Sequence, residues 1–219
     1  MIRATNLLTE KERKAAKALI ASCQAYDQTF REPYLSNMLN FDLKMPAFFL
    51  YYQEGDLIGL LTVYADDEDV EVSILVDPSH RRQGVGRAMY RSFEKDMAAY
   101  PIRSVTFQTE RVFLDRHPDL ASHWGVVEDE ETETWLGRDR TPYALDSRSD
   151  VKVLLAAPAY VEEIAQLHHQ AFSDPEETLD VSRRYITEAL KDSDGLLYIL
   201  LKEAQVIGVC TVDLSGNSN

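Results

Sequence analysis

The chain has 219 residues, of which 45% are apolar and 27% are charged, with only 9 Gly and 8 Pro. This composition is typical of a folded globular protein and excludes disordered, collagen-like and low-complexity chains. Acidic residues outnumber basic ones by 37 to 23, and the formal net charge of −14 argues against nucleic acid or an anionic membrane as a partner. An acidic chain suits a cationic ligand such as an amine, although solubility alone also accounts for the charge.

Neither a membrane span nor a secretion signal is visible. The longest apolar runs, such as Ala47–Tyr52, are far shorter than the roughly 20 residues that cross a bilayer. Met1–Lys17 contains no apolar signal region. The two cysteines, Cys23 and Cys210, have no spacing typical of a disulfide framework or a zinc site. We therefore expect a cytoplasmic protein without a bound metal.

The first 140 residues alternate strand and helix signals. Thr9 and Glu12 fit a helix-capping box, and apolar residues at helical spacing continue to Cys23. Turn residues at Glu54–Asp56 separate two apolar strands and predict a hairpin. In chain order we expect a helix over 10–24, a short helix near 35–39, strands over 47–53, 57–65 and 70–76, a helix over 85–99, a strand over 102–108, a short helix near 112–116, and strands near 125–127 and 132–136.

A polar linker over 141–150 leads to what reads as an internal repeat in 151–219. At an offset of 149 residues, Ala47–Tyr64 aligns with Leu196–Asp213, and five aligned pairs are identical, including Gly59 with Gly208. We expect a strand over 151–155, helices over 158–172 and 179–190, and a hairpin over 196–213. Two similar apolar hairpins can arise by chance, but the matching order of elements upstream favours a duplication. The repeat is expected to be partial, because Val70 plus 149 is 219, the last residue.

The segment from Val70 to Tyr90 is the most informative part of the sequence. It reads as a strand, a turn with the pattern Arg81-x-x-Gly84-x-Gly86, and a helix. Glycines let backbone N–H groups approach a ligand, and a helix N-terminus attracts an anion such as a phosphate. Residues 80–91 contain four arginines and no acid, within an acidic chain. The alternative is an ordinary turn with solvated arginines. The pattern lacks the features of a P-loop or of a dinucleotide fingerprint.

This segment resembles the acetyl-CoA signature of the GNAT superfamily of acyl-CoA-dependent N-acyltransferases. Members typically show a strand ending in V-x-P, here Val76–Pro78, then R/Q-x-x-G-x-G/A and a helix. The preceding order of a short strand, two helices and a hairpin also matches. The resemblance implies an α/β fold with a mixed, mostly antiparallel sheet flanked by helices over residues 1–140. It implies that acetyl-CoA binds at Ile74, Leu75 and Val76, through its pantetheine, and at Arg81, Arg82, Gln83, Gly84, Val85, Gly86 and Arg87, through its pyrophosphate.

The reaction implied is direct transfer of the acetyl group to an amine of a small molecule, peptide or protein. An amine with a pKa near 10 is mostly protonated at neutral pH, so a base must accept its proton. Family members often use a Glu near the start of the fourth strand, and Glu71 is the candidate. The alternative is that Glu71 is one more solvated acid beside Asp66–Asp69. The Tyr that usually protonates the leaving thiolate is replaced by Leu114, so water or the released ammonium proton would do so.

Other interpretations stay open. Because the usual Tyr is missing and the second unit is partial, the protein could instead be a non-catalytic acyl-CoA-binding or protein-interaction module. His117 and His123 lie in the irregular region where an acceptor pocket could form. We expect one cofactor site per chain, in the first unit. Because the strand Val206–Val212 would have an unpaired edge, residues 151–219 are expected to cover an edge or face of the first unit or to mediate a homodimer.

Overall fold

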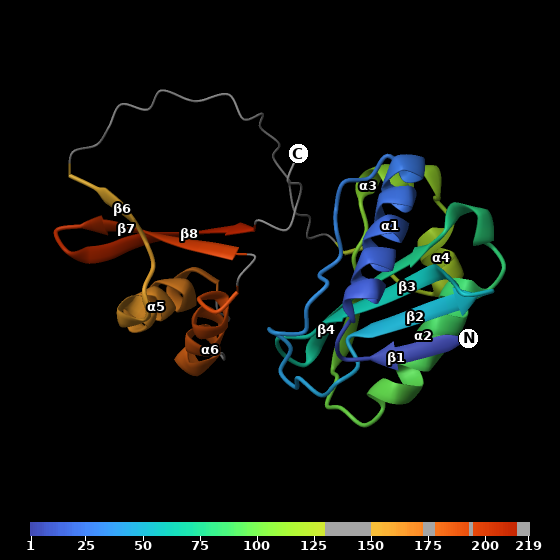
Figure 1. Ribbon diagram of the computed structural model, residues 1–219, viewed down its shortest axis with the longest axis horizontal. Helices are drawn as coiled ribbons and strands as arrows, with labels where there is room; N and C mark the ends of the chain where they lie inside the picture. Colours follow the sequence, from blue (N-terminus) through green and yellow to red (C-terminus); the bar gives the residue numbers. More distant parts are fainter. Residues whose placement is uncertain (130–149, 173–177, 193–194, 214–219) are drawn as a thin grey trace. The chain divides into compact units, whose positions relative to one another are not determined.

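A computed structural model describes residues 1–129, 150–172, 178–192 and 195–213. The chain divides into two compact units, Met1–Glu133 and Thr134–Asn219, and each contains its own β-sheet (Figure 1). None of the described helices is long and apolar enough to span a bilayer.

The first unit is built on a five-stranded sheet in the order β1-β2-β3-β4-β5. Its strands are β1 (Ile2–Thr5), β2 (Phe48–Gln53), β3 (Asp56–Tyr64), β4 (Asp69–Val76) and β5 (Ser104–Phe107). The first four pair in antiparallel fashion, and β5 runs parallel to β4. The predicted mixed, mostly antiparallel sheet is therefore confirmed, and β1 is the short strand that precedes the first helix.

Two helices cover opposite faces of this sheet (Figure 1). The capping box of Thr9 and Glu12 forms as predicted at the start of α1 (Glu10–Asp27). The apolar face of α1, including Leu19, packs against Leu50 and Leu60. Alternate strand residues face the other way, where α2 (Val85–Met97) buries its own apolar stripe of Val85, Met89, Phe93 and Met97. Sheet alternation thus separates two cores on either side of β2 and β3.

Two predictions about the first unit were wrong. No helix forms at 35–39, because asparagine side chains there bond to backbone groups instead. Asn37 Nδ2 donates to the Leu43 carbonyl at 3.0 Å, and Asn40 Oδ1 accepts from the Ala65 N–H at 3.0 Å.

The strand expected at 125–127 is also absent. The predicted short helix α3 (Arg111–Arg116) is followed by a further helix, α4 (Leu120–Trp124). Gly125, with φ of 69°, ends α4 in the left-handed conformation, and the Val126 N–H donates to Ala121 O at 3.0 Å. The strand expected at 132–136 lies outside the described residues.

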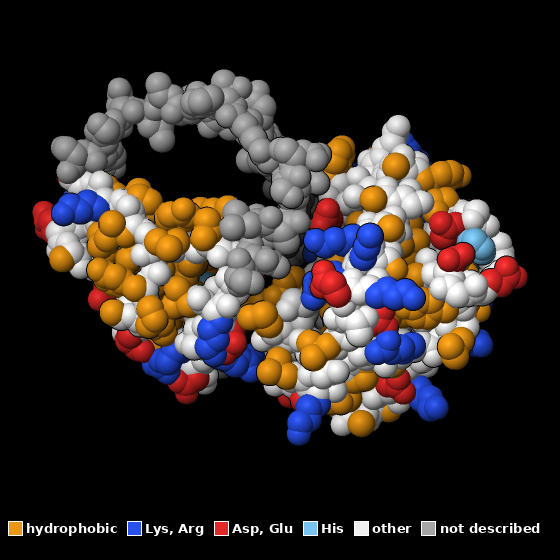
Figure 2. Space-filling model, viewed as in Figure 1, with side chains coloured by type: hydrophobic (Ala, Val, Ile, Leu, Met, Phe, Trp, Pro, Cys, Tyr) orange, Lys and Arg blue, Asp and Glu red, His pale blue; other side chains and the backbone are white. Residues whose placement is uncertain are grey.

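The second unit has a three-stranded antiparallel sheet in the order β6-β7-β8. Its elements are β6 (Lys152–Leu155), a single 3-10 turn η2 (Pro158–Tyr160), α5 (Val161–Phe172), α6 (Leu179–Ala189), β7 (Gly195–Lys202) and β8 (Gln205–Asp213). Both helices pack on one face of the sheet, around Ile164, Ile186 and Ile199. Figure 2 shows exposed hydrophobic side chains on this unit. Its exposed large hydrophobic residues include Val153, Leu155 and Ile207.

The hairpins of the two units correspond in geometry at the offset found in the sequence. Phe48 pairs with Thr62, and Leu197 pairs with Thr211. The strand β2 carries a bulge between Tyr51 and Tyr52, and β7 carries one between Leu200 and Leu201. Both turns place two successive residues at positive φ, at 54–55 and at 203–204. The strand register, the bulge and the turn of the first hairpin therefore recur in the second hairpin 149 positions later. The helix α6 has no counterpart in the first unit.

Candidate active site

The strands β4 and β5 separate halfway along β4. Their parallel pairing covers Asp69–Val72, and the Gln108 N–H donates to the Val72 carbonyl at 3.0 Å as its last bond. Among the described residues, no strand pairs with Ser73–Val76 on this side. Since strand residues alternate in direction, the N–H and C=O of Ile74 face the same way as those of Val72. They therefore point into the opening beyond β5.

The turn after β4 leads to a helix start without a side-chain cap. Asp77 accepts a hydrogen bond from the Ser79 N–H at 2.9 Å, and bonds from Ser79 and His80 lower the pKa of its carboxyl. Arg82 has φ of 61°, and Gly84, with φ of 85°, is the residue that precedes α2. The first N–H groups of α2 thus have neither an intrahelical acceptor nor a capping side chain. This end of the helix suits a bound anion.

The four arginines near the turn do not share one environment. Arg82, Arg87 and Arg91 are exposed, and an Arg87 Nη2 lies 3.3 Å from His123 Nε2. The Arg81 guanidinium instead points into the protein and forms a bidentate pair with the Asp27 carboxylate. The Arg81 side chain is therefore held by Asp27 and does not join the exposed three, for which binding to one anion stays a prediction.

Three aromatic rings lie where α2, β5 and α4 meet. Tyr90, Phe107 and Trp124 contact one another with ring centroids 5.2 to 5.6 Å apart. A Cβ atom added to Gly86 would lie 3.6 Å from Trp124 Cζ2 and 3.6 Å from Ile74 Cγ2, which is ordinary contact. Burial, followed by the charge of Glu94, raises the pKa of Tyr90. The rings thus form an apolar wall beside the first turn of α2.

Glu71 lies on the opposite face of β4 from its valine neighbours. Val70 and Val72 are buried beneath α2, so they do not surround the Glu71 carboxylate. An Arg31 Nη2 atom lies 3.5 Å from that carboxylate, and the Glu71 side chain is 39% exposed. Arg31 also donates from Nη1 to Gln108 Oε1 at 2.7 Å. One arginine therefore joins the strand that carries the candidate base to the residue after β5.

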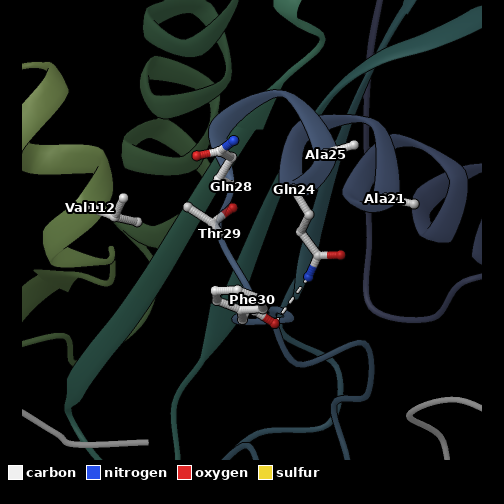
Figure 3. A pocket seen from close by; sticks show the side chains of 7 residues that line it. All are labelled: Ala21, Gln24, Ala25, Gln28, Thr29, Phe30 and Val112. Carbon is white, nitrogen blue, oxygen red and sulfur yellow. Dashed lines mark hydrogen bonds between the residues drawn. The ribbon is translucent and has the colours of Figure 1, made fainter.

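The loop that carries Arg31 is held to the sheet by a second acid. Glu110 Oε1 accepts hydrogen bonds from the N–H groups of Phe30 and Arg31, each at 2.7 Å. A hollow of about 710 Å³ adjoins this loop at the last turns of α1, and Gln24 Nε2 donates to the Phe30 carbonyl at its edge (Figure 3). Its lining residues are Ala21, Gln24, Ala25, Gln28, Thr29, Phe30 and Val112. None carries a charge, so the hollow suits an uncharged part of a ligand.

The remaining candidates contribute less to this region. Leu114 lies half-buried in α3 and offers no proton. His117 packs against the Phe113 ring with centroids 4.5 Å apart. No cluster of metal-ligating side chains occurs within the described ranges.

Sequence reasoning missed Asp27, Arg31 and Glu110. Asp27 pairs with Arg81, Arg31 pairs with Glu71, and Glu110 binds the backbone of residues 30 and 31. The two members of each pair are 40 to 80 positions apart in the chain. The sequence showed no periodicity or spacing that would link them.

Two solved structures share the fold over nearly the whole chain. A GCN5-related N-acetyltransferase from Sphaerobacter thermophilus matches with a TM-score of 0.59 at 18% identity, over 96% of this chain and 70% of its own. A tandem GNAT protein from the clavulanic acid biosynthesis pathway, without acetyl-CoA, matches with a TM-score of 0.57 at 16% identity, over 99% of this chain and 76% of its own. A search of curated proteins finds no match.

The sequence itself assigns the family. Residues 14–131 match the model of the acetyltransferase (GNAT) family, which is more than half of the 219 residues. The matched range contains the open edge of β4, the glycine turn and α2, as well as Glu71. The chain therefore belongs to the GNAT acetyltransferase family.

Proposed function

We propose that the protein transfers an acetyl group from acetyl-CoA to an amine by direct attack. The observation that carries this proposal is that the open edge of β4 at Ile74 lies beside the uncapped start of α2 at Gly84–Gly86, where a Cβ on Gly86 would be 3.6 Å from Ile74 Cγ2. A strand edge can bond the amides of an extended arm, and a helix start can bind a diphosphate. Acetyl-CoA combines both groups in one molecule.

The backbone does most of the binding in this proposal. Ile74 offers one N–H and one C=O to the pantetheine amides, and Leu75 and Val76 continue the same strand. The N–H groups of Val85, Gly86 and Arg87 point out of the first turn of α2 toward the pyrophosphate. The exposed Arg82 and Arg87 add positive charge at its edge. Gln83 holds the turn by donating from Nε2 to the Ser79 carbonyl at 3.1 Å.

Glu71 acts on the acceptor. It takes a proton from the ammonium form, directly or through a water, and frees the lone pair of the amine. The nitrogen then forms a bond to the thioester carbonyl carbon, the C–S bond breaks, CoA leaves as a thiolate, and the nitrogen loses its second proton as the amide forms. Since Leu114 cannot supply a proton, the thiolate receives one from water or from the proton that the amine has lost.

A second candidate function is a non-catalytic acyl-CoA-binding or interaction module. Leu114 at the position of the usual acid and the guanidinium of Arg31 beside Glu71 favour it. A free-thiol assay with acetyl-CoA and a panel of small-molecule and peptide amines separates the two, because only turnover releases CoA. Light scattering on the full chain tests the accompanying proposal that the second unit mediates a homodimer.

The cofactor site is tested by changing Gly86 in two ways. Gly86→Asp places a negative charge where the pyrophosphate would bind, whereas Gly86→Ala adds only a Cβ at ordinary contact distance. An acid in the first turn favours the helix itself, but the Cβ of residue 86 faces Ile74, Val76 and Trp124, so circular dichroism is used to check that the Asp variant is folded. Calorimetry should give one acetyl-CoA per chain, near-normal affinity for the Ala variant and a large loss for the Asp variant. Unchanged affinity in Gly86→Asp would place acetyl-CoA elsewhere.

A further inference from the structure

The first arginine of the glycine turn is bound to a buried acid on another element. Arg81 Nη1 and Nη2 donate to the two carboxylate oxygens of Asp27 at 2.7 and 2.6 Å. Asp27 is the last residue of α1 and is only 6% exposed. The hydrogen bonds that Arg81 donates to Asp27 raise the pKa of its guanidinium. This bidentate, charge-assisted geometry is the strong form of an arginine–carboxylate pair.

The rest of the guanidinium is also engaged. Arg81 Nε donates to the Val76 carbonyl, at the end of β4, at 3.0 Å. The rings of Tyr26 and Phe113 lie 5.4 and 5.8 Å from the Arg81 guanidinium carbon. Hydrogen bonds from Arg81 Nε and both Nη atoms thus connect the glycine turn to the end of α1 and the end of β4. The Phe113 ring of α3 packs against the same guanidinium.

A second arginine supports the same corner. Arg116 Nη1 donates to the Asp27 carbonyl at 2.6 Å, and its Nη2 donates to Gln28 Oε1 at 2.7 Å. These bonds satisfy carbonyl groups at the C-terminus of α1, where positive charge is favourable. The position of Asp27 is therefore fixed independently of the turn, so Asp27 can serve as an anchor for Arg81.

We propose that Asp27 is a positioning residue for the acetyl-CoA diphosphate and that Arg81 does not itself bind phosphate. The Asp27–Arg81 pair fixes the start of a turn in which Arg82 has φ of 61° and Gly84 has φ of 85°. This turn leads directly into the first N–H groups of α2, which have no capping side chain. Moving Arg81 onto a phosphate would leave a buried carboxylate without its partner, which is unfavourable. The proposal rests on the cofactor site proposed above.

The competing role for Arg81 gives the opposite result in one variant. If Arg81 were a phosphate ligand restrained by Asp27, Asp27→Asn would release it and tighten acetyl-CoA binding. If Asp27 positions the turn, Asp27→Asn loosens the turn and weakens binding. The sign of the change in Kd therefore separates the two roles.

The experiment uses the full chain with Asp27→Asn, and Asp69→Asn as the matched control. Asp69 pairs with Arg103 at the start of β4, remote from the turn. We expect Asp27→Asn to raise the Kd for acetyl-CoA roughly tenfold or more, with kcat at saturating acetyl-CoA changed little. Acetyl-pantetheine has the thioester arm but no diphosphate, so its kcat/KM should be the same in both variants. A general structural defect would lower activity with both donors.

Arg81→Lys is the second variant, since it keeps the charge but loses the bidentate fork. We expect it to behave as Asp27→Asn does, whereas a phosphate-binding arginine would tolerate lysine. An unchanged or lower Kd for acetyl-CoA in Asp27→Asn, or an equal loss with acetyl-pantetheine, would overturn the proposal. Failure of the unmodified protein to bind acetyl-CoA would instead overturn the proposed function, so the two failures are distinguishable.

Discussion

The Nη2 atom of Arg31 lies 3.5 Å from Glu71 Oε2. The same guanidinium donates to Gln108 Oε1 at 2.7 Å, and the Arg31 N–H donates to Glu110 at 2.7 Å. The candidate base is thus anchored by a loop that is itself fixed to the end of β5. An amine that approaches Glu71 has to do so beside this guanidinium.

The first prediction concerns the proton relay. Glu71→Gln keeps the size of the side chain and removes the proton acceptor, so kcat should fall by roughly 10²-fold or more. The Kd for acetyl-CoA, measured by calorimetry, should barely change. Glu68→Gln is the control, because Glu68 is an exposed acid of the neighbouring acidic run. An equal loss of kcat in Glu71→Gln and Glu68→Gln would mean that these acidic residues only attract a cationic acceptor. Unchanged kcat in Glu71→Gln across pH 6–9 would remove Glu71 from the mechanism.

The second prediction compares Gly59 and Gly208, which occupy equivalent hairpin positions. A Cβ at Gly59 would lie 2.8 Å from Val85 Cγ1 and 2.9 Å from Met89 Cε, because α2 packs closely across β3 there. The three atoms nearest to a Cβ at Gly208 belong to the Leu200 side chain, at 3.5 Å or more. We expect Gly59→Ala to lower the free energy of unfolding by about 1–3 kcal/mol. Gly208→Ala should be neutral or stabilising by up to about 1 kcal/mol.

Denaturant titrations of the two variants against the unmodified chain measure this difference. Each variant is the control for the other, since both add one methyl group to a β-strand glycine. A destabilisation of similar size at Gly208 would show that a further element packs on that face of the second sheet.

Sequence patterns correctly predicted those elements that depend on interactions between residues close together in the chain. The capping box at Thr9, the turn at 54–56 and the strand–turn–helix at 70–97 all depend on residues close together in the chain, and all formed. The helix expected at 35–39 failed because Asn37 and Asn40 bond to backbone groups at Leu43 and Ala65. The apolar spacing there was compatible with a helix, and side-chain hydrogen bonds decided against it.

The sequence indicated some residues of the candidate site but not the ion pairs between distant elements. The glycine turn could be recognised because its residue types and spacing are local properties, and Glu71 was suggested by the family resemblance and stays a prediction. The role of Arg81 could not, because four nearby arginines look alike until Asp27, 54 positions earlier, is seen to hold one of them. Ion pairs between distant elements depend on the tertiary fold, and one sequence carries no signal for them.

The third prediction concerns the pH dependence of stability. Burial raises the pKa of the Asp66 carboxyl, and a hydrogen bond from Tyr64 only partly offsets this. The folded protein therefore holds the Asp66 proton more tightly than the unfolded chain, so this group's stabilisation is present at low pH and is lost as pH rises above the ordinary value for an aspartate. The Asp66→Asn side chain does not ionise, so this variant does not lose that stability as pH rises. Its stability should equal that of the unmodified chain near pH 3.5 and exceed it at pH 7, as urea midpoints would show.

Asp69→Asn provides a control of opposite sign. Hydrogen bonds from Arg103 and Ser104 lower the pKa of Asp69 to about 2. A carboxyl whose pKa is depressed stabilises the fold above the ordinary value and loses that effect as pH falls through its folded pKa. The Asn variant should therefore be less stable than the unmodified chain at pH 7. A lower stability of Asp66→Asn at pH 7 would contradict the assignment for Asp66.

The fourth prediction concerns the two thiols. Cys210 is exposed, whereas Cys23 is 3% exposed and its Sγ lies 3.4 Å from the Val76 carbonyl. Burial raises the pKa of the Cys23 thiol, and the charge of Arg81 offsets this rise only in part, so little reactive thiolate forms. At pH 8 a thiol reagent should modify Cys210 quickly and Cys23 only on unfolding, and mass spectrometry of peptides reads each site. Fast modification of Cys23 in the folded chain would show that the corner formed by α1, β4 and Arg81 opens readily.

With Cys210→Ser as the background, the modification rate of Cys23 reports on that corner. Acetyl-CoA should slow this modification further, because a bound ligand stabilises the closed form.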